Sequence, residues 1–314
     1  MTSYICPDSL ETLNSFAFHD SKLESITFNK SLTTLGSSAF EGTKLVEVTI
    51  PGSVKTIPFQ CFNACSSLKT VHIEEGITTI EDYAFGSCGK LYSIDFPASL
   101  TTVNSCFYNG FPTVINIVSV DDWCEIRFVE DNFAFANPLR YGGSNEKGRL
   151  YVDGKIISGK VVLKEGITNI PRFTFRHTSV TEVVLPSTLT TIEWGAFHDK
   201  KMTSITVQSS IRFTSDVFRN GTIDTLKIAK NNISISAFAE ATSISQLVIG
   251  SDVTNVLASN LALDNISSIV FESSTPPIIS GTFISAGVPI YVPANVVDLY
   301  KETYTENANY IYSR

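Results

Sequence analysis

The chain has 314 residues, of which 43% are apolar, and it carries a formal net charge of −8 with an isoelectric point near 5.1. An acidic chain without a run of Lys or Arg is poorly suited to nucleic acid, because phosphate recognition normally relies on a concentrated excess of those residues. The longest apolar stretches, such as 114–120, are far shorter than the roughly 20 residues that cross a bilayer. We therefore expect neither nucleic-acid binding nor a membrane span.

Residues 1–11 lack both the basic start and the apolar core of a secretory signal, which alone would suit a cytosolic protein. Repeat residues begin by Leu10, however, with no polar terminal cap before them, and solenoids generally need such caps. We interpret this start as favouring removal of a leader or an early start of the repeats.

A pattern of about 22 residues recurs along the chain. A regular copy spans residues 32–50 and reads Leu-Thr-Thr-Leu, then Ala-Phe, then Leu-x-x-Val-x-Ile. The marker phenylalanines lie at positions 18, 40, 62, 85, 175, 197, 218 and 238, in steps of 20 to 23 residues within each block. This period suits one coil of a leucine-rich repeat, in which a short strand and a turn or short helix complete one rung.

The Leu-x-x-Val-x-Ile segment alternates with period two, so its apolar residues are predicted to point inward and the residues between them outward. Rungs stacked about 4.8 Å apart would form a parallel sheet along one face. A single rung cannot bury its apolar side alone. Residues 1–271 are therefore predicted to form one solenoid domain.

The recurring Ile-Thr-x-Ile, Ala-Phe and Leu-x-x-Ile-x-Ile/Phe-Pro segments, with Pro51, Pro97 and Pro186 after the strands, resemble BspA-like, or TpLRR-type, leucine-rich repeats. The copies at 32–96 and 167–207 carry the resemblance most clearly, and it covers most of the chain. It implies a right-handed leucine-rich-repeat coil. Because that family is known mainly as surface or secreted proteins in adhesion and partner binding, it also implies a non-enzymatic binding protein.

The regular copies are interrupted between the strands that begin at Ile94 and Val161. These positions are 67 residues apart, close to three periods, so residues 112–166 are predicted to hold irregular rungs and a hairpin. The segment 121–124 predicts a short helix, and 150–157 predicts a hairpin around an Asp-Gly turn. The Trp-Cys, Asn-Pro-Leu and Tyr-Val-Asp-Gly elements here resemble an irregular repeat of the same family. Residues 140–149, with three glycines, are predicted to form a loop.

The repeat pattern ends after Phe271. Proline pairs and a polar, tyrosine-rich run follow, and residues 272–314 resemble the C-terminal cap of the family. A cap would protect the last strand from pairing with another chain.

Motifs that carry chemistry are scarce. The run Gly154 to Val161 nearly matches a phosphate-binding P-loop, but Val161 replaces the metal-binding Ser or Thr and a strand is expected where the motif needs a helix. The H-E-x-x-H, G-x-S-x-G and G-x-G-x-x-G motifs and paired zinc-ligand spacings are absent. We expect no catalytic residues, metal or cofactor, although a triad could still assemble from dispersed residues.

Cysteines and histidines follow the repeat. Cys65 and Cys88 occupy the same place in adjacent rungs, so a disulfide is geometrically allowed, whereas two buried thiols are the favoured interpretation. His19 and His198 each follow a marker phenylalanine and precede an aspartate. We interpret these His-Asp pairs as surface turns copied with the repeat.

The outward strand positions form two columns and are the best functional candidate. Thr and Val suit exposed strands, which would explain most of these positions, but solenoids also bind through such extended faces. Few aromatic residues occur there, so modest or avidity-based affinity is expected. The predicted ligand-binding residues are Glu47, Thr49, Thr70, His72, Ser93, Asp95, Glu182, Thr206 and Lys227.

Three functions remain open from the sequence. The first is a monomeric surface or secreted adhesion module for protein or glycan partners, such as extracellular-matrix or host-surface molecules. The second is an intracellular interaction scaffold of the same fold. The third is a hydrolase, with a site where residues 123–141 would fold over the sheet.

Overall fold

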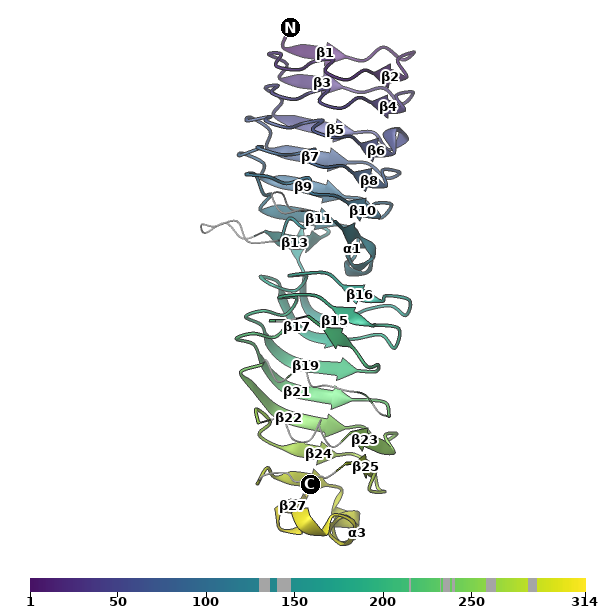
Figure 1. Ribbon diagram of the computed structural model, residues 1–314, viewed down its shortest axis with the longest axis vertical. Coiled ribbons are helices and arrows are strands. Elements are labelled where there is room, and N and C mark those ends of the chain that lie inside the picture. The colour runs from purple at the N-terminus through teal and green to yellow at the C-terminus, as the bar shows by residue number, and fades with distance from the viewer. Residues whose placement is uncertain are drawn as a thin grey trace. The chain divides into compact units, whose positions relative to one another are not determined.

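The computed structural model describes residues 1–129, 136–139, 148–214, 216–231, 233, 238, 241–257, 264–281 and 287–314. The chain divides into two compact units, Met1–Ile157 and Ser158–Arg314 (Figure 1). Most of the predicted loop at 140–149 lies outside the described residues.

The first unit stacks parallel strands, one from each rung, followed by one short antiparallel strand. The first two strands pair only with each other, and the next six form a separate sheet in the order β14-β13-β11-β9-β7-β5. The strands are β1 (Ser3–Ile5), β3 (Ser25–Thr27), β5 (Glu47–Ile50), β7 (Thr70–Ile73), β9 (Ser93–Phe96), β11 (Val114–Ile117), β13 (Arg149–Val152) and β14 (Lys155–Ile156). Along β5 every second residue is buried, as the repeat pattern predicts.

A second set of shorter strands completes each rung, and the sequence did not predict it. These strands are β2 (Thr12–Leu13), β4 (Thr34–Leu35), β6 (Thr56–Ile57), β8 (Thr79–Ile80), β10 (Thr102–Val103) and β12 (Arg127–Phe128). Thr33, Thr78 and Thr101 each donate a hydroxyl hydrogen bond to a backbone carbonyl of the preceding rung. The threonines of the repeat therefore link neighbouring rungs.

The turn that follows each short strand carries the marker phenylalanine into the core. Phe40, Phe62 and Phe85 are fully buried, and their rings stack with centroids 5.2 and 5.7 Å apart. Most of these turns place left-handed residues two positions before and two positions after the phenylalanine, such as Gln60 (φ 53°) and Ala64 (φ 56°). The turn thereby closes the rung around a continuous column of rings.

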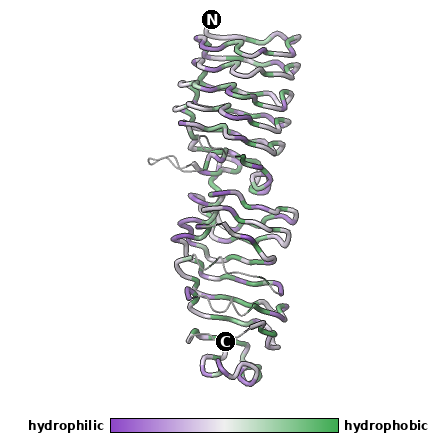
Figure 2. The backbone as a smooth tube through the Cα atoms, in the orientation of Figure 1, coloured by the Kyte–Doolittle hydropathy of each residue, from purple (hydrophilic) through white to green (hydrophobic). Residues whose placement is uncertain are grey.

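The second unit repeats this architecture with an eight-stranded sheet of long strands. They are β15 (Ser158–Val162), β17 (Ser179–Val184), β19 (Lys201–Val207), β21 (Thr222–Ile228), β22 (Ser243–Ile249), β24 (Ile269–Phe271), β26 (Ile290–Val292) and β27 (Ile311–Ser313). The short strands are β16 (Asn169–Ile170), β18 (Thr191–Ile192), β20 (Arg212–Phe213), β23 (Asn255–Leu257) and β25 (Ile278–Ser280). Figure 2 shows hydrophobic and hydrophilic residues interleaved along the rungs of each unit.

The described parts of residues 112–166 contain the predicted short helix and the predicted hairpin. Helix α1 (Val120–Glu125) begins after Ser119, whose hydroxyl accepts a hydrogen bond from the amide of Asp122. Strand β11 pairs in parallel with β9 and β13, so the irregular rungs stay in phase with the regular ones. Strands β13 and β14 form an antiparallel hairpin whose turn residues, Asp153 and Gly154, both have positive φ. Strand β15 follows directly, which confirms that the P-loop-like run is not followed by a helix.

The C-terminal segment extends the sheet of the second unit beyond Phe271. Strand β26 pairs with β24, and β27 pairs with β26. A 3-10 turn (Ala294–Val296), helix α3 (Val297–Thr303) and a second 3-10 turn (Thr305–Tyr310) lie between these strands. The hydroxyl of the buried Tyr300 donates to the carbonyl of Ser273, 3.0 Å away. The assignment of 1–271 as one domain and 272–314 as a cap stays a prediction.

All six cysteines are free and buried, so Cys65 and Cys88 are not bridged. The Cys65 thiol instead contacts the hydroxyl of Thr43, at 3.2 Å. Burial raises the pKa of every cysteine thiol, and that of Cys65 rises to about 11. These thiols therefore serve as small core residues.

Candidate functional site on the strand face of the first unit

The strand register brings the predicted residues of the first unit into two adjacent columns. Glu47 lies opposite Thr70, which lies opposite Ser93, and the second column pairs Thr49 with His72 and His72 with Asp95. These six side chains all point away from the core, on β5, β7 and β9. The sequence prediction of their mutual placement is confirmed, whereas their role in binding stays a proposal.

His72 is the centre of a polar network across this face. Its Nδ1 lies 2.5 Å from Asp95 Oδ2, and its Nε2 lies 3.4 Å from Glu47 Oε1. Because a carboxylate oxygen accepts, His72 donates from Nδ1, and this contact fixes the orientation of the ring. The His72 side chain is 40% exposed, so the imidazole remains accessible to a partner while its geometry is set.

Asn116, which is not among the residues predicted from the sequence, extends the network by one strand. Its Nδ2 donates to Asp95 Oδ1 at 2.6 Å, and β11 places it directly opposite Asp95. Tyr151 of β13 follows in the same column. The in-phase spacing of the irregular rungs is the signal that could have found both residues.

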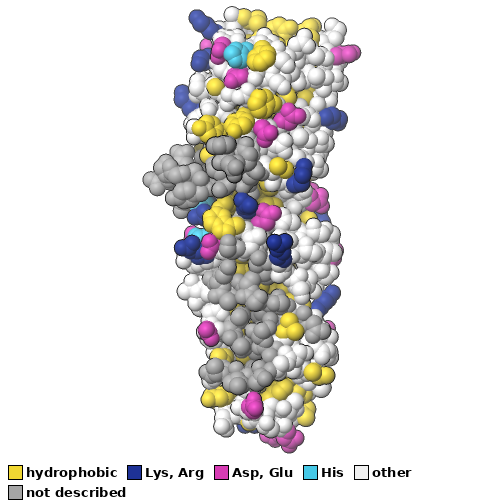
Figure 3. Space-filling model, viewed as in Figure 1, with side chains coloured by type: hydrophobic (Ala, Val, Ile, Leu, Met, Phe, Trp, Pro, Cys, Tyr) yellow, Lys and Arg dark blue, Asp and Glu magenta, His cyan; other side chains and the backbone are white. Residues whose placement is uncertain are grey.

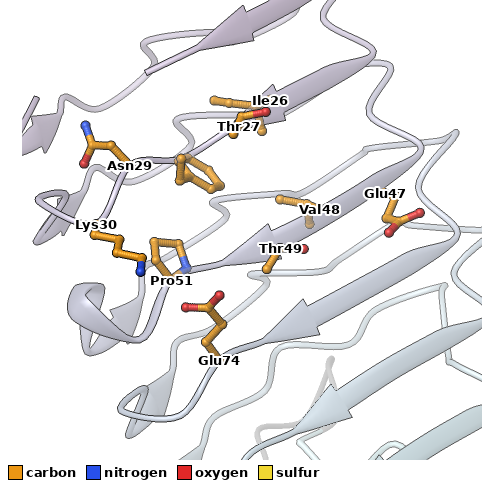
Figure 4. A pocket seen from close by; sticks show the side chains of 10 residues that line it. Ile26, Thr27, Asn29, Lys30, Glu47, Val48, Thr49, Pro51 and Glu74 are labelled. Atoms are coloured by element: carbon orange, nitrogen blue, oxygen red, sulfur yellow. The ribbon is translucent and has the colours of Figure 1, made fainter. Parts of the chain in front are cut away.

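A groove opens beside this network, between β3 and β5. No strand pairing joins β3 to β5, although β1–β3 and β5–β7 are regular parallel pairs. The groove has a volume of about 400 Å³, and Figure 4 shows it along the strands. Its lining residues are Ile26, Thr27, Phe28, Asn29, Lys30, Glu47, Val48, Thr49, Pro51 and Glu74.

The groove has different chemistry along its length. Glu47 lies at one end, and Lys30, Pro51 and Glu74 lie at the other (Figure 4). Phe28, which also lines the groove, is half-buried, with its ring edge-on to Phe40 at 5.7 Å. Two predicted binding residues, Glu47 and Thr49, therefore line a cavity as well as the strand face.

The predicted binding residues of the second unit are placed differently. Glu182 pairs with Lys160 at 2.6 Å, and Lys227 pairs with Glu272 at 2.7 Å. The outward-pointing Val248 of β22 is only 5% exposed. Thr206 lies opposite Val184 and is half-buried. Two of these three candidates are thus engaged in ion pairs on the surface.

The two His-Asp pairs lie at turns, as predicted, but the His198 side chain is only 14% exposed, with its Nδ1 2.8 Å from Asp199 Oδ2. His19 Nδ1 is 3.4 Å from Asp20, and its Nε2 is 3.7 Å from Glu41. Asp20 and Asp199 both have positive φ at the same position after the marker phenylalanine. Repeat geometry therefore accounts for both pairs.

Residues 123–141 were the predicted location of a hydrolase site. Trp123 is fully buried against Phe128, with ring centroids 4.9 Å apart. Residues 130–135, 140 and 141 lie outside the described residues. Within the described ranges, no group of three or more His, Cys, Asp or Glu side chains is placed to hold a metal ion.

The helices in the described part of the chain are all too short or too polar to cross a membrane.

Stacked rungs, parallel sheets and buried phenylalanine columns define a leucine-rich-repeat solenoid. The chain belongs to the family of the BspA type leucine rich repeat region, whose model matches residues 1–113 and 159–288 with six copies. The unmatched segment between these ranges holds the irregular rungs and the hairpin.

Several solved bacterial proteins have chains similar to this one. One is the pneumococcal vaccine antigen PcpA, at 16% identity and a TM-score of 0.38, with 100% of this chain and 79% of that chain covered. Another is a leucine-rich repeat protein from Bacteroides ovatus, at 17% identity and a TM-score of 0.41, with 100% and 84% covered. A leucine rich cell surface protein from Faecalibacterium prausnitzii has 18% identity and a TM-score of 0.29, with 92% and 90% covered. Among the curated proteins, none matches this chain.

Proposed function

We propose that this protein is a non-enzymatic binding module that recognises a protein or glycan partner through the outward strand face of its first unit. The observation that carries the proposal is the network of Glu47, His72, Asp95 and Asn116, beside an open groove. Four neighbouring strands each contribute one member, so the sheet itself holds the polar groups in place. Groups that are already oriented lose less freedom on binding, which favours recognition.

The composition of this face suits modest affinity. Its carboxylates and imidazole are partly exposed, and exposed charge pairs contribute on the order of 1 kcal/mol or less each. Strong binding would then need several contacts along the array or several copies of the module. Membership of the BspA-type family supports a place at the cell surface or outside the cell, and we propose that location and an adhesive role.

The test is a binding screen of the purified chain against immobilised extracellular-matrix proteins and glycans. The test variant carries Glu47→Ala, His72→Ala and Asp95→Ala. The first unit offers a control of identical composition on its turns, namely His19→Ala, Asp20→Ala and Glu41→Ala. All three proteins are first compared by thermal melting, so that a loss of binding is not a loss of folding.

A partner that binds the native chain and the turn variant, but not the strand-face variant, would support the proposal. A partner that the turn variant loses and the strand-face variant keeps would move the binding surface elsewhere. If none of the partners binds any of the three proteins, the adhesive role is rejected.

An intracellular scaffold of the same fold is the second candidate function. The observation that favours it is the set of six unbridged cysteines, because secreted proteins often use disulfides and cytosolic ones rarely do. Labelling intact source cells with a membrane-impermeant biotin reagent separates the two candidates: a labelled chain supports the surface function, and an unlabelled chain that is recovered from the soluble lysate supports the scaffold.

A further inference from the structure

The groove between β3 and β5 has a more specific chemistry than the strand face as a whole. We propose that it receives a single lysine or arginine side chain from a partner protein, with the cationic group at the Glu47 end. This inference rests on the proposed binding function and names the partner chemistry at one part of that surface.

The size and walls of the groove suit a long aliphatic stem. From Glu47 to Pro51 the chain advances about 13 Å, at about 3.3 Å per residue. This length exceeds the reach of one extended lysine or arginine side chain. Ile26 and the half-buried Phe28 provide apolar surface along this path. Lysine and arginine bury their methylene stems on such surfaces and keep the charged group in a polar setting.

The charge of the groove selects a cation and fixes its direction. The Glu47 carboxylate is 64% exposed, and the hydroxyl of Thr49, also on the lining, is close along the strand. At the other end the Lys30 ammonium and the Glu74 carboxylate both line the groove, so their opposite charges offset each other there (Figure 4). The favourable position for a cation is therefore beside Glu47, next to the His72 network.

The net charge of the first unit also favours a basic partner. Residues 1–157 contain 18 acidic and 11 basic residues, whereas residues 158–314 contain 13 and 12. The first unit thus carries nearly all of the net negative charge. A basic partner would be attracted to this unit before it reaches the groove.

The apolar surface seen from the turn side is a different feature. Figure 3 shows hydrophobic side chains gathered over the upper rungs of that side. The ring of Tyr83 lies next to the rings of Phe59 and Tyr108, with centroids 6.2 and 6.1 Å away. These rings lie on the turns that carry the marker phenylalanines, and they are not among the residues that line the groove.

The experiment uses two blocked peptides as probes, acetyl-Gly-Ser-Lys-Ser-Gly-amide and the same peptide with norleucine in place of lysine. Norleucine keeps the stem and removes the charge. Binding is followed by methyl NMR of the whole chain, with the Ile26 methyl group as the reporter inside the groove. We expect the lysine peptide to shift this signal with weak affinity, and the norleucine peptide to bind at least about fivefold more weakly.

Variants then distinguish binding in the groove from general electrostatic attraction to the acidic first unit. Glu47→Gln should lower the affinity for the lysine peptide about fivefold, because one partly exposed charge pair is lost. The affinity for the norleucine peptide should not change. Glu125→Gln removes the same charge from the exposed side of α1 and should not change the affinity for either peptide. Thr49→Trp should fill the groove and abolish the Ile26 shift, with native melting as evidence that the chain still folds.

Three results would overturn the inference. The first is no Ile26 shift with the lysine peptide up to about 10 mM, a concentration well above the range of weak specific binding. The second is equal weakening by Glu47→Gln and Glu125→Gln, which would leave only general electrostatic attraction. A partner from the binding screen that requires His72 and Asp95 but tolerates Thr49→Trp would also reject the groove, while the strand-face function stands.

Discussion

Replacing Phe62 with leucine tests whether the stacked phenylalanines hold neighbouring rungs together. Phe62 is fully buried, and its ring stacks on Phe40 at 5.2 Å and on Phe85 at 5.7 Å. An aromatic pair contributes about 0.5 to 1.5 kcal/mol beyond its buried area, so the loss of two pairs costs roughly 1 to 3 kcal/mol. The reduced packing of the smaller side chain adds about 1 kcal/mol. We expect Phe62→Leu to lower the free energy of unfolding by about 2 to 4 kcal/mol.

The measurement is urea denaturation followed by tryptophan fluorescence. The chain has two tryptophans, one in each unit, so a Trp194→Phe background leaves Trp123 as the reporter of the first unit. Trp123 is fully buried and should change its emission on unfolding. A shift of the midpoint at constant slope gives the change in free energy directly.

Double-mutant cycles sharpen this test. Phe40 and Phe62 are in ring contact, so Phe40→Leu and Phe62→Leu should couple by about 1 kcal/mol. Phe40 and Phe85 are separated by Phe62. The changes in unfolding free energy caused by Phe40→Leu and Phe85→Leu should therefore add to within about 0.5 kcal/mol. A cost below about 1 kcal/mol for Phe62→Leu, or equal coupling in both cycles, would refute the nearest-neighbour explanation.

The remaining predictions concern thiols, tyrosines and turns. All six thiols should resist Ellman's reagent at pH 8 and react after unfolding, because burial raises their pKa, to about 11 for Cys65, and blocks access; fast reaction of the folded chain would contradict this. Burial raises the pKa of Tyr300 and Tyr304, so their stabilising effect should be complete below about pH 10 and decline above it as they ionise. Thermal melts from pH 9 to 12 check this, and Tyr304→Phe, which cannot ionise, should show a smaller alkaline loss. Ala64 has a φ of 56°, so Ala64→Gly should stabilise the chain by about 0.5 kcal/mol in urea denaturation, and Ala64→Val should destabilise it.

The regular rungs could be predicted closely from the sequence, because their periodicity specifies both burial and register. The pairing of Thr49, His72 and Asp95 follows from the position of each residue within its copy of the repeat. Helix α1 and the β13–β14 hairpin also matched local signals, namely an acidic helix start and an Asp-Gly turn.

The short strands and the left-handed turn positions could not be predicted in the same way. Two residues, as in β6 or β8, are too few to show a period. The left-handed positions are occupied by residues such as Gln60 and Tyr83, which carry none of the glycine signal that usually marks positive φ. Packing of the rung imposes these conformations against local preference.

The groove illustrates a further limit of repeat-based prediction. Leu23, Ile26 and Phe28 fit the same pattern as the residues of β5, yet no pairing joins β3 to β5. Phe28 remains half-buried, whereas Ile50 at the equivalent position is fully buried. A repeat pattern identifies which residues face the core, but the separation of two rungs depends on how their side chains and backbones fit across the interface between them. Concave sites in such a solenoid therefore arise where the stacking is interrupted, and a search for function should begin at unpaired neighbouring strands.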